Sequence, residues 1–77
     1  MKYKVGDKVK VREWDDMAKE FRIDEDGDID TGRNCFFVGD MKKFCGKTVT
    51  IVASNGQVYK IAGDDDWYFV DEMLNDN

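Results

Sequence analysis

Gly46-Lys47-Thr48-Val49-Thr50-Ile51-Val52, continued as far as Asp71-Glu72-Met73-Leu74, is the stretch that decides the fold of this chain. It contains an alternating β-branched run, an Asn-Gly pair, an acid-rich segment at 63–66 that predicts a turn, and an aromatic run at 67–70. Apolar runs separated by turn residues in this way are typical of a β-meander. We therefore predict a mainly β fold, a small and partly open β-barrel of about five strands with a short helical turn.

The turn near Asn55 can be placed in two registers, and the apolar pattern chooses between them. A two-residue Asn55-Gly56 loop would mix apolar and polar side chains on both faces of the hairpin. A three-residue loop, Ser54-Asn55-Gly56, instead pairs Ile51 with Tyr59, Thr50 with Lys60 and Val49 with Ile61. Because a slip of one residue exchanges the two faces, we predict the second register, with Gly56 in the left-handed region.

Shorter elements are predicted ahead of the meander. Lys8-Val9-Lys10-Val11-Arg12 alternates charged and β-branched residues, which indicates a strand with both valines facing inward. The spacing of Trp14, Met17, Ala18 and Phe21 predicts one face of a short helix, and an irregular loop held by the two aromatic residues is the alternative.

The remaining segments give weaker patterns. Residues 24–34 are polar and predict a long exposed loop, with a short strand at 28–30 as an option, and residues 35–38 predict a strand. Met41 and Phe44 predict a single helical turn that ends at Gly46. In the closing turn we expect Asp71 to act as a cap and Met73 or Leu74 to plug the open barrel end. Residues 75–77 predict a frayed tail.

Size and composition exclude several classes of protein. Seventy-seven residues make one domain, spanning 1–77, and the chain has neither proline nor histidine. The absence of histidine excludes histidine metal sites and histidine general bases. A net charge of −5 makes general nucleic-acid binding unlikely, because the phosphate backbone repels acidic proteins.

The charge is distributed unevenly along the chain. Residues 1–12 carry five basic side chains against one acid, and residues 13–30 carry nine acids against two basic side chains. The simplest interpretation is a set of solvated faces with internal charge complementarity, and a patch for a basic partner is the alternative.

The expected location is the cytoplasm of a host cell. The basic N-terminus is not followed by the apolar run of a signal peptide, and no stretch approaches the length of a membrane span. In that compartment Cys35 and Cys45 are expected to be free thiols.

Three segments carry a family resemblance. Lys4-Val5-Gly6-Asp7-Lys8-Val9-Lys10-Val11, residues 41–51 and Trp67-Tyr68-Phe69-Val70-Asp71-Glu72-Met73-Leu74 resemble, in order and spacing, small proteins of phages and prophages. The resemblance implies an SH3-like barrel and an origin in a mobile element, and it implies no activity. It does not cover residues 13–35, so no role for that segment can be carried over.

The acid run at 24–30 resembles part of a calcium loop. Asp24, Asp26, Asp28 and Asp30 occupy the first, third, fifth and seventh EF-hand positions. However, the sixth position, which needs glycine, is Ile29, and the twelfth, which needs a bidentate glutamate, is Cys35. We expect a solvated acidic loop, with weak calcium binding as the alternative.

The aromatic residues divide into core and surface candidates. Phe44, Tyr59, Trp67 and Phe69 are expected to fill the barrel, and Trp14, Phe36, Phe37 and Tyr68 cannot all be buried in so small a core. We expect no catalytic residues and no cofactor, because the chain lacks a histidine base, a glycine-rich phosphate loop and a ligand cluster.

The function that follows from these expectations is that of a non-enzymatic protein-interaction module with an unknown protein partner. Its predicted contact surface consists of Trp14, Phe36, Tyr68, Asp24, Asp26 and Asp28. One alternative is an acidic inhibitor that imitates nucleic acid and occupies a host DNA-binding protein. Another is a barrel that acts as an oligomer through its open edge. We expect a monomer or a weak dimer.

Overall fold

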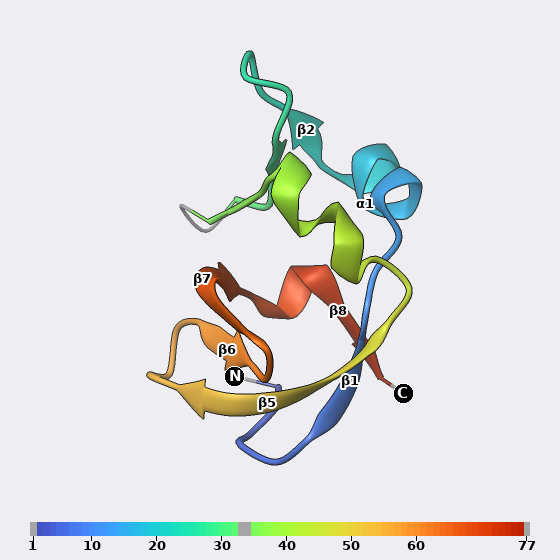
Figure 1. The fold of residues 1–77 in the computed structure, drawn as a ribbon. Coiled ribbons are helices and arrows are strands. Elements are labelled where there is room, and N and C mark those ends of the chain that lie inside the picture. Colours follow the sequence, from blue (N-terminus) through green and yellow to red (C-terminus); the bar gives the residue numbers. More distant parts are fainter. Residues whose placement is uncertain (1, 33–34, 77) are drawn as a thin grey trace.

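The computed structural model describes residues 2–32 and 35–76, which form two antiparallel sheets (Figure 1). The larger sheet has five strands in the order β7-β6-β5-β1-β8. Its strands are β1 (Lys8–Val11), β5 (Thr48–Ser54), β6 (Tyr59–Ile61), β7 (Asp64–Phe69) and β8 (Leu74–Asp76). The prediction of a mainly β, partly open barrel of about five strands is therefore confirmed.

A second group of elements lies between β1 and β5. The helix α1 (Trp14–Glu20) confirms the helical alternative for this segment, and three two-residue strands form the smaller sheet in the order β2-β3-β4. These strands are β2 (Arg22–Ile23), β3 (Ile29–Asp30) and β4 (Phe36–Phe37). A 3₁₀ helix, η1 (Gly39–Phe44), follows them and is longer than the single turn predicted.

The optional short strand predicted at 28–30 is confirmed as β3, so the loop predicted at 24–34 is shorter than the whole segment. Residues 24–28 form the turn between β2 and β3, whereas Ile29 and Asp30 belong to β3. Ile29 is completely buried, and burial of this apolar side chain accounts for the strand in an otherwise polar stretch. Residues 33–34 lie outside the described part of the chain.

The core combines residues of both sheets with residues of α1 and η1. Val9 and Val11 face inward, as predicted, and Phe69 packs edge-on against Phe37 and Phe44 at ring-centroid distances of 6.4 and 5.9 Å. The fully buried side chains are Val9, Val11, Met17, Ile29, Phe37, Met41, Ile51, Tyr59, Ile61, Phe69, Val70 and Met73. Core residues from both sheets thus hold α1, the smaller sheet and η1 against the five-stranded sheet.

The β5–β6 hairpin has the predicted buried face and a different register. Ile51 pairs with Ile61 instead of Tyr59, and a β-bulge precedes the pair of Ala53 with Lys60. At Ile51 the difference is two residues, so the same side chains stay inside. The loop runs from Asn55 to Val58, and Gly56 has the predicted positive φ, +89°.

The acidic turn predicted at residues 63–66 is wrong. Asp64 pairs with Ile61 across a two-residue turn, and Asp64, Asp65 and Asp66 are the first residues of β7. Gly63, with φ of +86°, supplies the conformation that the tight turn needs, so the acids that follow can extend. Asp64 is 8% exposed, and its Oδ1 atom accepts the Asp66 N–H at 3.3 Å.

The chain closes through a short 3₁₀ helix, η2 (Asp71–Met73), and the strand β8. Met73 and Leu74 are buried, as predicted for the plug. The frayed tail predicted at 75–77 is wrong for residues 75–76, which pair with β1 because that strand otherwise lacks a partner on this side. Asn77 lies outside the described residues.

Asp71 does not cap η2 with its side chain, contrary to the prediction. Its carboxylate instead accepts hydrogen bonds from the Tyr59 hydroxyl and from the Lys2 backbone N–H. The Tyr59 oxygen in turn accepts the Tyr3 N–H at 2.9 Å. Burial, followed by the hydrogen bond to Asp71, raises the pKa of Tyr59 to about 12. The N-terminal arm is thereby tied to the barrel near η2.

Arg12 joins the helix α1 to the 3₁₀ helix η2. Its Nη1 atom donates to the Glu72 carbonyl at 2.8 Å, and its Nε and Nη2 atoms donate to Asp16 at 2.9 Å and Glu20 at 2.7 Å. The guanidinium also lies 5.5 Å from the ring centre of Phe21. The hydrogen bond from Arg12 lowers the pKa of Asp16.

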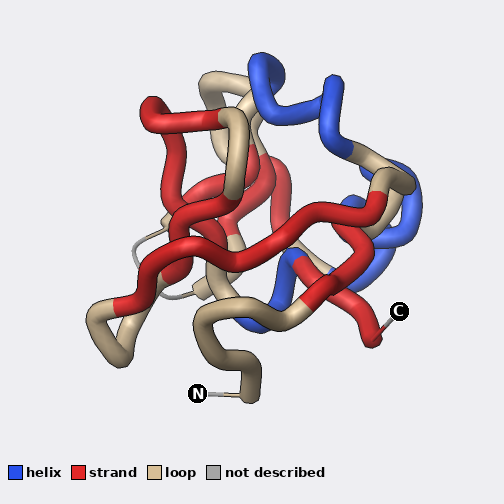
Figure 2. Tube along the Cα trace, turned by 60° about the horizontal axis from the view of Figure 1, so that its bottom comes forward, coloured by secondary structure: helices blue, strands red, loops and turns tan. Residues whose placement is uncertain are grey.

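Figure 2 shows the molecule from another side, with β8 and the N-terminal arm near each other, as they are in Figure 1.

Among the described residues, none of the helices has the length and apolar character required to cross a membrane.

Candidate functional site

Tyr68 is the most prominent aromatic side chain on the surface of the larger sheet. It lies in β7, where Phe69 faces the core, so the alternation of the strand turns Tyr68 outward, and 51% of it is exposed. On β6, Lys60 likewise lies between two buried residues and faces outward. Its Nζ atom lies 5.1 Å from the ring centre of Tyr68 and donates to the Asp65 carbonyl at 3.0 Å.

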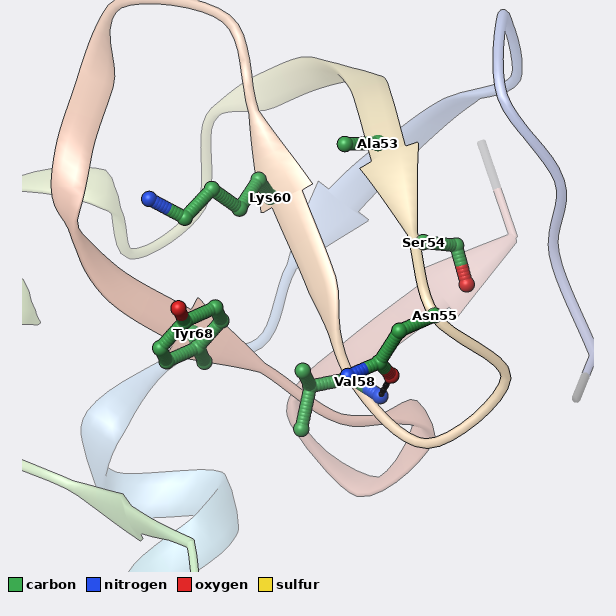
Figure 3. A pocket seen from close by; sticks show the side chains of 6 residues that line it. All are labelled: Ala53, Ser54, Asn55, Val58, Lys60 and Tyr68. Atoms are coloured by element: carbon green, nitrogen blue, oxygen red, sulfur yellow. Dashed lines mark hydrogen bonds between the residues drawn. The ribbon is translucent and has the colours of Figure 1, made fainter.

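A first depression lies on one side of Tyr68, on the outer face of β5, β6 and β7 (Figure 3). Its volume is about 240 Å³, and its lining combines apolar side chains with the polar ends of Ser54, Asn55 and Lys60. The lining residues are Ala53, Ser54, Asn55, Val58, Lys60 and Tyr68.

A second depression of about 330 Å³ lies on the other side of Tyr68, between β7 and the β4 segment. It is mostly apolar, and Phe36, which is 42% exposed, contributes to its wall. The Cys35 thiol donates a weak hydrogen bond to the Tyr68 carbonyl at 3.6 Å, which joins the two segments at this point. The lining residues are Cys35, Phe36, Val38, Asp66, Trp67 and Tyr68. We call the two depressions together the Tyr68 surface.

The structure therefore brings together two of the predicted contact residues, Phe36 and Tyr68. Trp14 lies elsewhere: it is half-buried, its ring centre is 6.0 Å from that of Phe37, and Lys42 Nζ is 4.1 Å from its ring centre. These contacts make Trp14 part of the packing between α1, β4 and η1.

The acidic residues of the predicted surface form the turn between β2 and β3. Asp24 Oδ1 accepts the N–H groups of Asp26 and Asp28, both at 2.9 Å, and one carboxylate oxygen from each of the three residues lies within 4.8 Å of the others. Asp30 is in β3 and accepts the Gly32 N–H at 2.8 Å instead. Figure 1 shows this turn at the top of the molecule, away from β6 and β7. None of Asp24, Asp26 and Asp28 lines the depression that Phe36 and Tyr68 share.

The two cysteines are free thiols in the structure. Burial raises the pKa of both Cys35 and Cys45, which disfavours the reactive thiolate form. Cys35 therefore lines the second depression and donates a hydrogen bond there. Its protonated thiol is a poor nucleophile.

Sequence reasoning missed the lining residues on β5, the β5–β6 loop and β6. Alternation gives a signal for Lys60, because it predicts that Tyr59 and Ile61 both face inward, so the residue between them must face outward. No comparable signal existed for Asn55 and Val58, which depend on the length of the loop. In comparisons with family models, with curated proteins and with solved structures, nothing matches this chain.

Proposed function

We propose that this chain is a non-enzymatic protein-interaction module that binds its partner through the Tyr68 surface. The observation that carries the proposal is the position of Tyr68, half-exposed on a strand with a depression on each side. Tyrosine is enriched at the centres of protein interfaces because its ring buries a large area while its hydroxyl stays satisfied by polar neighbours.

The surroundings of Tyr68 support a preorganised contact. Lys60 is held over the ring by its bond to the Asp65 carbonyl, and Cys35 contacts the Tyr68 carbonyl from the β4 side. Because these side chains are already ordered, a partner loses little conformational entropy from this side on binding. Phe36 adds apolar area next to the ring, and Asp66 supplies a charge at the wall.

The resemblance to phage and prophage proteins fits a small binding module that acts in the cytoplasm of a bacterial host. Within this proposal the protein works through a host or phage partner, and the acidic β2–β3 turn is a solvated end of the molecule. The nucleic-acid mimic remains the rival, because residues 13–30 concentrate the acids.

A selection of random displayed peptides on the purified protein tests the proposal. Peptides enriched on the native protein should lose binding to a Tyr68→Ser variant and to a Phe36→Ser variant. Val5→Ser is the matched control, because Val5 is 59% exposed and lines neither depression. Equal binding of the enriched peptides to the native protein and the Tyr68 variant would refute the site.

The ionic strength separates the two functions. Binding through an aromatic surface should persist in high salt, whereas binding through the acid run should disappear, because salt screens exposed charges. Retention of binding by Tyr68→Ser together with loss in salt would favour the mimic.

A further inference from the structure

The Asn55-Gly56 pair in the β5–β6 loop has a chemical property that its structural role does not use. A glycine after asparagine leaves the next peptide nitrogen unhindered, so this nitrogen can attack the side-chain amide of the asparagine. Asn55, Gly56 and Gln57 are all exposed, and apart from the two chain neighbours no residue comes within 4 Å of the position that a Cβ would take on Gly56. The residues that carry the reacting atoms are therefore exposed to water.

The loop surrounds these atoms with suitable hydrogen bonds. Asn55 Oδ1 accepts the N–H groups of Gln57 at 2.9 Å and Val58 at 3.0 Å, and Figure 3 draws the bond to Val58. The side chain is consequently folded back over the peptide that follows it. Two backbone donors on an amide oxygen stabilise the negative charge that develops there when the carbonyl carbon is attacked.

The attacking nitrogen also has a partner. The Gly56 N–H donates to Ser54 Oγ at 3.3 Å. A hydroxyl in this position can accept the proton that the nitrogen must lose and pass it on through water. The loop and the last residue of β5, Ser54, thus bring together a nucleophile, a proton acceptor and an oxyanion-stabilising pair.

We propose that the β5–β6 loop is a site of spontaneous deamidation at Asn55 and that the folded loop accelerates the reaction. The Gly56 nitrogen forms a bond to Asn55 Cγ, and its proton passes through Ser54 Oγ and water to the departing amide nitrogen. The Cγ–Nδ2 bond breaks and ammonia leaves, which closes a five-membered succinimide. Water then adds to one of the two ring carbonyls and opens the ring to aspartate or isoaspartate, without any oxidant or reductant.

The products would change the candidate surface. Asn55 lines the first depression beside Tyr68 and Lys60, so either product places a new negative charge at its wall. Isoaspartate additionally lengthens the backbone by one methylene in the loop that sets the register of β6. Age of the protein would then alter a surface exposed to partners, whether or not that surface has the function proposed above.

The test incubates the full-length protein in mildly alkaline buffer, both folded and unfolded in urea. Peptide mapping by mass spectrometry measures conversion at each asparagine, and released ammonia is quantified in parallel. We expect conversion at Asn55 while Asn75 stays intact, and a faster rate in the folded protein. A rate at Asn55 that is equal or lower in the folded protein overturns the proposal.

Two variants examine the proton acceptor. Ser54→Ala should slow the folded-state reaction about tenfold, which corresponds to about 1.4 kcal/mol of barrier. Ser54→Thr retains the hydroxyl and should retain the rate. Circular dichroism and thermal melting verify that both variants are folded, and an unchanged rate in a folded Ser54→Ala variant also contradicts the proposal.

Discussion

Replacement of Arg12 by alanine should be among the most destabilising single changes outside the hydrophobic core. The guanidinium donates to the Glu72 carbonyl in η2, and the Arg12 side chain is only 11% exposed. A hydrogen bond from a charged group contributes about 1.5–3 kcal/mol, and the stacking on Phe21 adds about 0.5–1 kcal/mol. The side chains of Asp16 and Glu20 are 56% exposed. Because water screens exposed charges, these two ion pairs contribute only a small part of the stability that Arg12 provides.

The expected loss for Arg12→Ala is therefore about 3 kcal/mol, which lowers the melting temperature of a domain this small by about 12–24 °C. Urea unfolding followed by the fluorescence of Trp14 and Trp67 measures the loss directly. Arg12→Lys should recover only part of it, because a single ammonium cannot reproduce the three-way fork. The control is the double variant Asp16→Asn, Glu20→Gln, which keeps the bond to the carbonyl. If that double variant lost as much stability as Arg12→Ala, the assignment of the main energy to the Glu72 carbonyl would be wrong.

Three further predictions concern single sites. The pKa of Tyr59 is raised from 10 to about 12, so the stability from its protonated hydroxyl is complete below about pH 10 and is lost as the pH rises through 12. The native protein should lose about 3 kcal/mol across that window, and Tyr59→Phe should lack this component in alkaline urea titrations. Gly46→Ala should lower the free energy of unfolding by about 1–2 kcal/mol, because Gly46 has φ of +75°, a conformation that alanine adopts only with strain. The Glu13 side chain overlaps the position of the new methyl group but can move away, so a second change, Glu13→Ala, should restore little of the lost stability. Leu74→Ala should cost about 2–4 kcal/mol in urea melts, and a loss below 1 kcal/mol would show that β8 is not closely packed.

The inner face of the barrel could be predicted from the sequence because alternation alone determines it. Ile51, Tyr59 and Ile61 are buried as expected, even though the register between β5 and β6 is different. Within the longer loop, Asn55 Oδ1 accepts the N–H groups of Gln57 and Val58. Alternation contains no information about such side-chain bonds to the backbone, so the exact pairing was not accessible.

The polar strands were harder to predict for a different reason. Asp64, Asp65 and Asp66 have low β propensity, so this segment predicts a turn. Residues 75–76 have no apolar alternation, so they predict a tail. They extend because their neighbours β6 and β1 offer backbone groups that need partners. Local sequence cannot express a requirement that arises from another strand.

The candidate site was predictable only in part. The number of aromatic residues predicts that Phe36 and Tyr68 are exposed, and their proximity arises from the contact between β4 and β7, which are far apart in sequence. The same count predicts an exposed Trp14, but its place beside Phe37 gives it a packing role. The number of aromatic residues indicates that some of them must be exposed, but the tertiary structure determines which ones are.

The place of β1 between β5 and β8 has a consequence for how the chain acquires its fold. Both neighbours of this early strand come from the later part of the chain, and the pair with β8 joins residues 9–11 to residues 74–76. Contacts this distant in sequence slow folding, because loop closure must precede their energetic gain. During synthesis, β1 would leave the ribosome well before either partner, and the sheet could be completed only after residue 76 had emerged. Until then, Val9 and Val11 would stay open to chaperones and to other nascent chains.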